Sequence, residues 1–160
     1  MKKIYIILLF IISFISTSFS QVYNEKDSTY YSDSSYVKVY NGTMIHFFEE
    51  SNKMKSQISI IDGKWHGEKT DYYESGEVER KTTYINGVPH GTTYVYHENG
   101  ALQGQTSYEN GELNGDWLQY HPNGKILGKG KYLKGLIHGE TIWYDPEGNV
   151  SNFYKIELKW

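Results

Sequence analysis

A unit of 24 residues repeats four times through the C-terminal two-thirds of this chain. Three glycine positions mark each unit, and each recurs at steps of 24 residues: Gly63, Gly87, Gly111 and Gly135; Gly67, Gly91, Gly115 and Gly139; and Gly76, Gly100, Gly124 and Gly148. A fixed step over three columns is typical of an array in which each unit contacts mainly its neighbours. Such an array presents a surface more often than it builds a catalytic pocket.

Tyrosines also recur at fixed places in the unit. One column stands between the second and third glycines, and another stands near the end of the unit: Tyr72, Tyr96, Tyr120 and Tyr144; then Tyr84, Tyr108 and Tyr132, with Ile156 in the last unit. The chain has 16 Tyr and 16 Gly but only 3 Pro. This composition favours short, half-exposed strands joined by tight turns.

One β-hairpin is predicted in each unit. In residues 86–109, strand-forming runs at 92–96 and 102–108 flank His97-Glu98-Asn99-Gly100, where Asn-Gly readily adopts positive φ. A Gly-x-x-x-Gly loop is expected to link successive hairpins. The expected units are 62–85, 86–109, 110–133 and 134–158, followed by a C-terminal cap that ends at residue 160. A degenerate hairpin unit is expected at 36–61, with a turn at Asn41-Gly42, and it falls short of the period because 63 − 42 = 21.

Alternation along the strands predicts two different faces. A structural face collects the tyrosine columns with the small residues Thr82, Gly104, Thr106, Gly128 and Gly130 between them. The opposite face is expected to be polar but to turn apolar in the C-terminal half. There the predicted binding patch consists of Val95, Trp117, Leu127, Trp143 and Phe153. Alternatively, the C-terminal tail folds over this patch as its cap.

The N-terminal residues resemble a secretory signal peptide. Lys2 and Lys3 precede the apolar run 4–15, and Ser18-Phe19-Ser20 offers small residues for cleavage after Ser20. The alternative is an uncleaved membrane anchor, although a helical span needs about 20 apolar residues. The signal peptide is expected at 1–20, in an apolar helical conformation, and a flexible leader at 21–35. Export to the periplasm or the extracellular space is therefore predicted.

Charge and cysteine content exclude several classes of partner. The formal charge of the chain is −3, and removal of Lys2 and Lys3 leaves 14 basic against 19 acidic residues, or −5. This balance argues against nucleic acid and against anionic membrane surfaces, since both require a basic patch. The absence of cysteine excludes disulfides, thiol catalysis and thiolate metal sites. The fold must therefore rest on packing and strand pairing.

The histidines form two columns but do not predict a metal site. His66, His90 and His138 share one column with Asn114, and His97 and His121 share the hairpin-turn column. Equivalent residues of adjacent hairpins lie roughly 10 Å apart, whereas zinc holds its nitrogen ligands at about 2 Å. We expect the first column to hydrogen-bond loop carbonyls instead. No nucleophile elbow or phosphate loop is present, so no catalytic residue, metal or cofactor is predicted.

The repeat resembles a known family. Its pattern N-G-x-x-H-G … Y-x-x-N-G … Y is clearest in residues 86–91 and 121–125 and is similar to the MORN repeat. It most resembles the bacterial MORN variant, whose members are often labelled antitoxin-like proteins of toxin–antitoxin systems. The resemblance covers residues 62–158, and 41–61 more loosely. It implies successive antiparallel hairpins in one elongated, twisted, single-layer sheet that recognises proteins or membranes without chemistry of its own.

The sequence therefore predicts an exported, non-catalytic all-β repeat protein that acts as a protein-recognition or scaffold surface. Another protein is the expected partner. Two alternatives remain open: binding of a cell-surface glycan by the aromatic rows, and an antitoxin or immunity role against a partner toxin.

Overall fold

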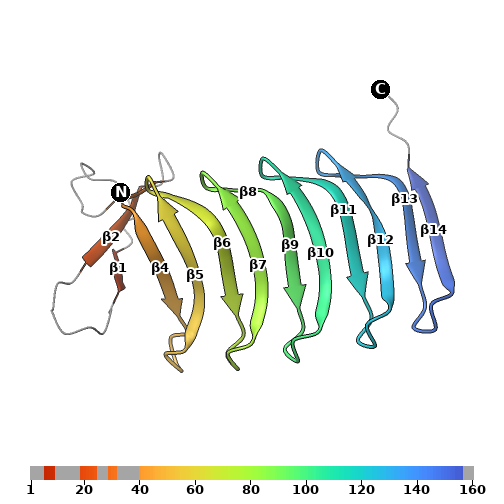
Figure 1. Cartoon of the computed structure of the whole chain (residues 1–160), viewed down its shortest axis with the longest axis horizontal. Coiled ribbons are helices and arrows are strands. Elements are labelled where there is room, and N and C mark those ends of the chain that lie inside the picture. Colours follow the sequence, from red (N-terminus) through yellow and green to blue (C-terminus); the bar gives the residue numbers. More distant parts are fainter. Residues whose placement is uncertain (1–5, 10–18, 25–28, 32–39, 157–160) are drawn as a thin grey trace.

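The structure, a computed structural model, describes residues 6–9, 19–24, 29–31 and 40–156. These residues form strands and turns, and they contain no helix that could cross a membrane. Eleven strands build one antiparallel sheet that extends as a single elongated layer from the N-terminal to the C-terminal end (Figure 1). The prediction of an all-β array of hairpins in one single-layer sheet is confirmed.

Five hairpins follow one another in the order of the sequence. They are β4 (Gly42–Phe47) with β5 (Met54–Ile61), β6 (Lys64–Tyr72) with β7 (Val78–Ile85), β9 (Gly91–Tyr96) with β10 (Leu102–Glu109), β11 (Glu112–Tyr120) with β12 (Ile126–Leu133), and β13 (Leu136–Tyr144) with β14 (Val150–Ile156). The short strand β8 (Val88–Pro89) pairs with β7 just before β9 begins. Strands β4 and β14 form the two edges of the sheet.

Two-residue turns join successive hairpins. Asn86 and Asn110 have φ of 51° and 50°, and the glycines that follow them have φ of 87° and 88°. Two positive φ values in succession define the type I′ turn, whose twist matches that of the flanking strands. The expected Gly-x-x-x-Gly loop is therefore wrong: residues 64–67 already belong to β6. The second glycine of this spacing, Gly67, has φ of 84° and lies where the register between β5 and β6 shifts.

The first unit is longer than the repeat, not shorter. The amide of Gly63 donates to the carbonyl of Tyr40 at 2.8 Å, as the amide of Gly87 donates to that of Trp65 at 2.8 Å. Tyr40 in the first unit is thus equivalent to Trp65 in the second, and the first unit has 65 − 40 = 25 residues. The additional residue lies in the hairpin turn of residues 48–53. The predicted 21-residue spacing and the turn at Asn41-Gly42 are wrong, because Gly42 pairs with Ile60 inside β4.

The N-terminal predictions fall largely outside the described residues. Within the expected signal peptide, Ile6–Leu9 forms β1, a strand that pairs with β2 (Phe19–Asn24), so the expected helical conformation is not found there. In the expected leader, β2 pairs with β3 (Thr29–Tyr31). Cleavage, export and the flexibility of the leader stay predictions. The tail expected to form the cap, residues 157–160, lies outside the described residues.

A small apolar cluster lies at the N-terminal end of the large sheet. Met44, Ile58 and Ile60 are buried, and Trp65 and Tyr84 pack against them with their rings in an edge-to-face contact at 5.1 Å. A single layer has no second layer to enclose a larger core. Cross-strand contacts between neighbouring side chains must therefore supply most of the stabilisation along the array.

Candidate recognition surfaces

A β-bulge in each hairpin decides which residues share a face. Gln119 pairs with Gly128, but the next residue, Tyr120, pairs with Ile126, so Leu127 is an additional residue on β12. The same kind of shift occurs beside the turn in the other four hairpins. Because Gln119 and Tyr120 point to opposite faces, Gly128 and Ile126 do so as well.

One face, here called the tryptophan face, carries Trp117 and Trp143. Trp117 lies directly opposite Thr106 on one neighbouring strand and Gly130 on the other. Directly opposed residues share a face. Alternation along the sequence places Trp117 on one side of the sheet and Thr106 and Gly130 on the other. That prediction is wrong, because all three share one face. Simple alternation through the hairpin ignored the additional residue in the bulge.

Glycines make room for the two indoles. The rings of Trp117 and Trp143 lie 5.4 Å apart at 47°. A methyl group at Gly128 would lie 2.6 Å from Cε3 of Trp143, and one at Gly130 would lie 2.8 Å from Nε1 of Trp117. Trp117 is only 5% exposed. Its indole therefore packs on the sheet and is not a free contact surface.

The structure does not gather the five predicted binding residues into one patch. Val95, Trp117 and Trp143 share the tryptophan face, where Val95 and Trp143 are half-buried. Leu127 is half-buried in its bulge. Phe153 is 52% exposed but pairs with Ile142, which places it on the opposite face. Binding by these residues stays a prediction.

The opposite face, here called the tyrosine face, carries two parallel rows of side chains. The first row alternates a tyrosine with an aliphatic residue across the sheet: Tyr72 with Val78, Tyr96 with Leu102, Tyr120 with Ile126, and Tyr144 with Val150. The second row runs further from the turns and lies two residues before each tyrosine on its strand. It consists of Thr70, Lys81, Tyr94, Gln105, Leu118, Lys129, Ile142 and Phe153.

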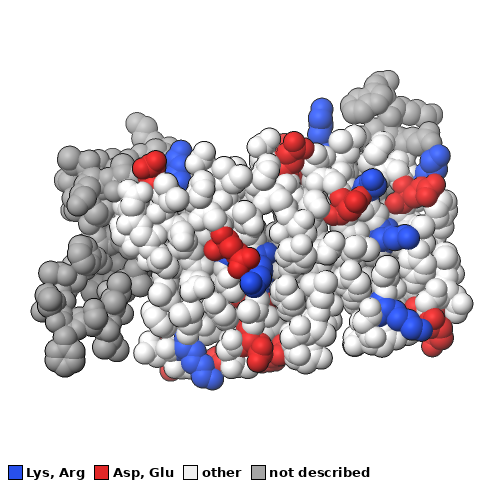
Figure 2. Space-filling view, in the orientation of Figure 1, with Lys and Arg blue, Asp and Glu red and all other residues white. Residues whose placement is uncertain are grey.

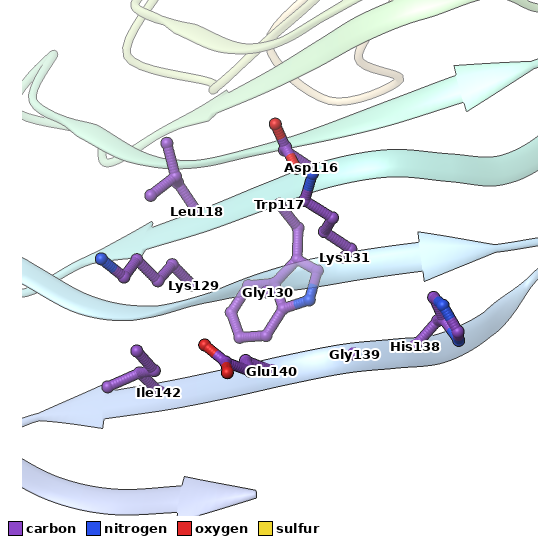
Figure 3. Close-up of a pocket in the computed structure, with 10 residues that line it drawn as sticks. All are labelled: Asp116, Trp117, Leu118, Lys129, Gly130, Lys131, His138, Gly139, Glu140 and Ile142. Carbon is purple, nitrogen blue, oxygen red and sulfur yellow. Dashed lines mark ion pairs between the residues drawn. The ribbon is translucent and has the colours of Figure 1, made fainter. Parts of the chain in front are cut away.

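A groove of about 630 Å³ lies on the tyrosine face over β11, β12 and β13. Leu118, Lys129 and Ile142 line one part of it, and the backbone of Gly130 and Gly139 also lines it (Figure 3). Asp116, Lys131, His138 and Glu140 form its remaining walls, and Trp117, whose indole lies on the tryptophan face, also lines it. Lys131 pairs with Asp116 at 3.3 Å, and Nζ of Lys129 lies 5.5 Å from the ring centre of Tyr144. The groove thus combines an apolar side with a polar rim.

Side chains at the hairpin turns tie neighbouring repeats together. Nε2 of His121 lies 2.9 Å from the carbonyl oxygen of Tyr144, and the hydroxyl of Tyr73, in the same column, donates to the carbonyl of Tyr96 at 2.7 Å. Nζ of Lys125 donates to the carbonyl of Glu147 at 2.8 Å. These bonds give His121 a structural role.

The other histidine column does not make the expected bonds. Nδ1 of His66 and Nδ1 of His138 are buried without a hydrogen-bond partner, and the side chain of Asn114 donates to the carboxylate of Glu109 instead of to a loop carbonyl. The expectation of loop-carbonyl bonds is wrong for these three residues. Among the described residues, no group of three or more His, Cys, Asp or Glu side chains is placed to hold a metal ion.

Strand β14 leaves an open edge at the C-terminal end of the sheet. All seven of its residues are exposed, including the apolar Val150, Phe153, Tyr154 and Ile156. Lys155 is the only charged residue in the strand. At the other edge, β4 buries Met44 completely. The two ends of the array therefore differ, and β14 presents the more apolar edge.

Comparison with known proteins agrees with this architecture. The family described as the MORN repeat variant matches residues 65–86, 89–110 and 113–134, three consecutive units. The matched units span β6 to β12 of the array. The same turn geometry and pairing extend it beyond the matched units, to β4–β5 on one side and β13–β14 on the other. No curated protein matches the chain.

Several solved structures share a weak likeness to this array. One is a complex of accessory secretory proteins 1, 2 and 3 from Streptococcus pneumoniae, with 12% identity, a TM-score of 0.39, and coverage of 69% of this chain and 20% of the other. The Gap123 glycosylation-associated complex from Streptococcus agalactiae has 15% identity and a TM-score of 0.39, with coverage of 72% of this chain and 21% of the other. A GtfA/B complex bound to UDP and GlcNAc has 10% identity and a TM-score of 0.29, with coverage of 81% of this chain and 27% of the other. The chain thus spans about a quarter or less of the length of these proteins.

Proposed function

We propose that this chain is a non-catalytic recognition or scaffold protein whose open edge, β14, accepts a strand from a partner protein. The observation that carries the proposal is the full exposure of β14 at the end of the sheet, with four large apolar side chains among its seven residues. The match of three units to the MORN repeat variant supports a binding or scaffold role.

An edge strand can extend the sheet into a partner. Its outward backbone amides and carbonyls pair with an added strand and supply affinity, while side chains on alternate faces supply specificity. Here Phe153 lies on the tyrosine face and Tyr154 on the tryptophan face. Edge strands that must stay unpaired commonly carry several charges, a proline or a bulge that twists them away. Strand β14 has one charged residue and no proline, and its bulge lies at the turn end, where the register with β13 shifts.

The non-catalytic part of the proposal rests on the architecture. A single-layer sheet exposes both faces to solvent, so it provides few enclosed sites in which carboxylates or histidines acquire strongly shifted pKa values. The groove on the tyrosine face places Lys131 beside Asp116 as an ion pair at 3.3 Å, so their opposite charges offset each other.

Export is a second part of the proposal and rests on the sequence of residues 1–20. Expression of the full chain in a bacterium, followed by cell fractionation and intact-mass measurement, tests it. A species that begins at Gln21 in the periplasm or medium is expected. A full-length chain that stays in the cytoplasm would refute export. An immunity role would be a special case of the same recognition, with a toxin as the partner.

Affinity capture tests recognition at the edge. The purified chain is compared with Tyr154→Lys, which adds a second charge to β14, and with Ile85→Lys, a control at an exposed apolar position on the interior strand β7. A partner bound at the edge should be captured by the wild type and by Ile85→Lys but lost with Tyr154→Lys. Circular dichroism confirms that all three proteins contain the same β structure.

A further inference from the structure

We propose that the tyrosine face binds an extended, neutral, β-1,4-linked polysaccharide, with one disaccharide unit over each hairpin. The sugar chain would run across the strands, along the two rows of side chains. This inference is independent of strand addition at β14, because it concerns a face of the sheet and not its edge.

The spacing of the tyrosines is the first argument. Tyr72, Tyr96, Tyr120 and Tyr144 stand at equivalent positions in successive hairpins and are therefore separated by two strand spacings, about 10 Å. A β-1,4-linked chain of pyranose sugars is a flat ribbon whose disaccharide repeat has nearly this length. Each tyrosine would therefore meet a chemically equivalent sugar, and four weak contacts would add along one polymer.

The chemistry of the first row suits the flat faces of sugars. The four tyrosines are half-buried, and aliphatic residues fill the positions between them, so the row forms a continuous apolar strip. In the part of the chain that the structure describes, none of the four hydroxyls is buried without a partner or engaged in a hydrogen bond. These hydroxyls therefore stay free to bond a ligand while the rings pack against its apolar C–H groups.

The second row adds hydrogen-bonding groups with the same period. Lys81, Gln105 and Lys129 occupy equivalent positions in three successive hairpins, each opposite Tyr94, Leu118 or Ile142 on the next strand. Ammonium and amide groups can donate to sugar hydroxyls. This row therefore supplies polar contacts beside the apolar strip.

The groove on the tyrosine face lies along this second row. Its volume of about 630 Å³ corresponds to roughly twenty water molecules at about 30 Å³ each, which leaves room for more than one sugar ring. Asp116 and Glu140 add acceptors at its rim, beside the backbone of Gly130 and Gly139 (Figure 3).

The charges of this face favour a neutral polymer. Lys81 pairs with Glu68 at 3.1 Å and Lys131 pairs with Asp116 at 3.3 Å, so these charges neutralise each other locally. The surface seen in Figure 2 likewise has scattered charges of both signs and no broad patch of one sign. Nucleic acid and anionic lipid both need such a basic patch, whereas a neutral glycan does not.

Oligosaccharides of graded length test the proposal. Isothermal titration of the folded full chain would use cello- and chito-oligosaccharides of two, four, six and eight sugars, with the α-1,4-linked malto-octaose as a control for linkage. At least one β-1,4-linked series should gain affinity with each disaccharide, to a total of about a hundredfold or more between two and eight sugars. Malto-octaose should bind at least about tenfold more weakly, because it coils out of register. Equal affinity at all lengths, or no binding of any octasaccharide by the folded protein, would overturn the proposal.

Variants locate the site and separate it from β14. The double substitution Tyr96→Ala with Tyr120→Ala should weaken binding of the octasaccharide by about tenfold or more, whereas Tyr120→Phe, which keeps the ring, should retain most of the affinity. Val95→Ala on the tryptophan face is the matched control and should bind as the wild type does. Tyr154→Lys should abolish strand addition but leave glycan binding intact. Unchanged binding by the folded double variant, or equal losses in it and in Val95→Ala, would refute the assignment to the tyrosine face.

Discussion

A single methyl group at Gly128 should destabilise the sheet because the indole of Trp143 occupies the space beside it. The added carbon would lie 2.6 Å from Cε3 and 2.7 Å from Cζ3 of Trp143, and 3.2 Å from Cζ3 of Trp117. The ring would have to move by at least 3.4 − 2.6 = 0.8 Å to restore ordinary contact. Forcing an additional carbon into a packed site typically costs about 1–3 kcal/mol. The φ of Gly128 is not positive, so backbone strain contributes little to this cost.

Urea unfolding followed by circular dichroism measures the effect. We expect Gly128→Ala to lower the free energy of unfolding by about 1–3 kcal/mol. In a Trp143→Ala background the ring is absent, so most of this cost should disappear, and the double-mutant cycle should show a coupling of about 1 kcal/mol or more. Gly139→Ala is the control: it meets no atom within 4 Å but has φ of 71°, so Trp143→Ala should not relieve its cost. A neutral Gly128→Ala, or an equal cost in both backgrounds, would refute this packing.

Three further predictions concern the turns and one histidine. Lys134, with φ of 50°, occupies the position that asparagine holds in two other turns, so Lys134→Asn should raise the free energy of unfolding by about 0.5–1 kcal/mol, measured in urea. Loss of the bond between His121 and the carbonyl of Tyr144 in His121→Ala should cost about 1 kcal/mol in the same assay. Burial, and then the charge of Lys69, lowers the pKa of His46 below 6.5. The unfolded chain therefore takes up this proton first as the pH falls from 7.5 to 5.5, stability decreases, and His46→Gln should reduce that decrease.

The architecture follows from spacing alone. Glycines at a fixed step, with Asn-Gly pairs between runs of strand-forming residues, leave a chain of hairpins as the simplest fold, and the structure has this form. The positions of the turns also follow from residue chemistry, because positive φ favours Gly and Asn. The spacing of the glycines indicates where the chain turns, and this indication does not depend on which side chains occupy the strands.

The composition of the two faces could not be obtained in this way. Alternation predicts that Ile126 and Gly128 share a face. The extra residue between them, Leu127, lies in a bulge, so Ile126 and Gly128 lie on opposite faces. A bulge changes the pairing without changing the repeat length, so a constant period conceals it. The sequence does contain one signal: Gly128 and Gly130 occur in the hairpin that also contains Trp117, and large residues need small neighbours.

The first unit shows a similar limit. Gly42 and Gly63 both follow an Asn or Asp residue, which suggests that they are equivalent. The amide of Gly63 nevertheless donates to the carbonyl of Tyr40, the counterpart of Trp65. The hairpin turn at 48–53 has its own composition, without the glycine found in the other units. Only the pairing of the strands identifies the additional residue in this turn.

Capture of a partner by the edge strand is the most direct test of the account. Residues 21–160, the chain that the proposed cleavage would leave, would be exposed to envelope and secreted fractions beside Tyr154→Lys and Ile85→Lys, and the captured proteins would be identified by mass spectrometry. The account predicts one stoichiometric partner that is retained by the wild type and by Ile85→Lys and lost with Tyr154→Lys. The same partner captured equally by all three folded proteins, or none captured by any of them, would contradict recognition at β14.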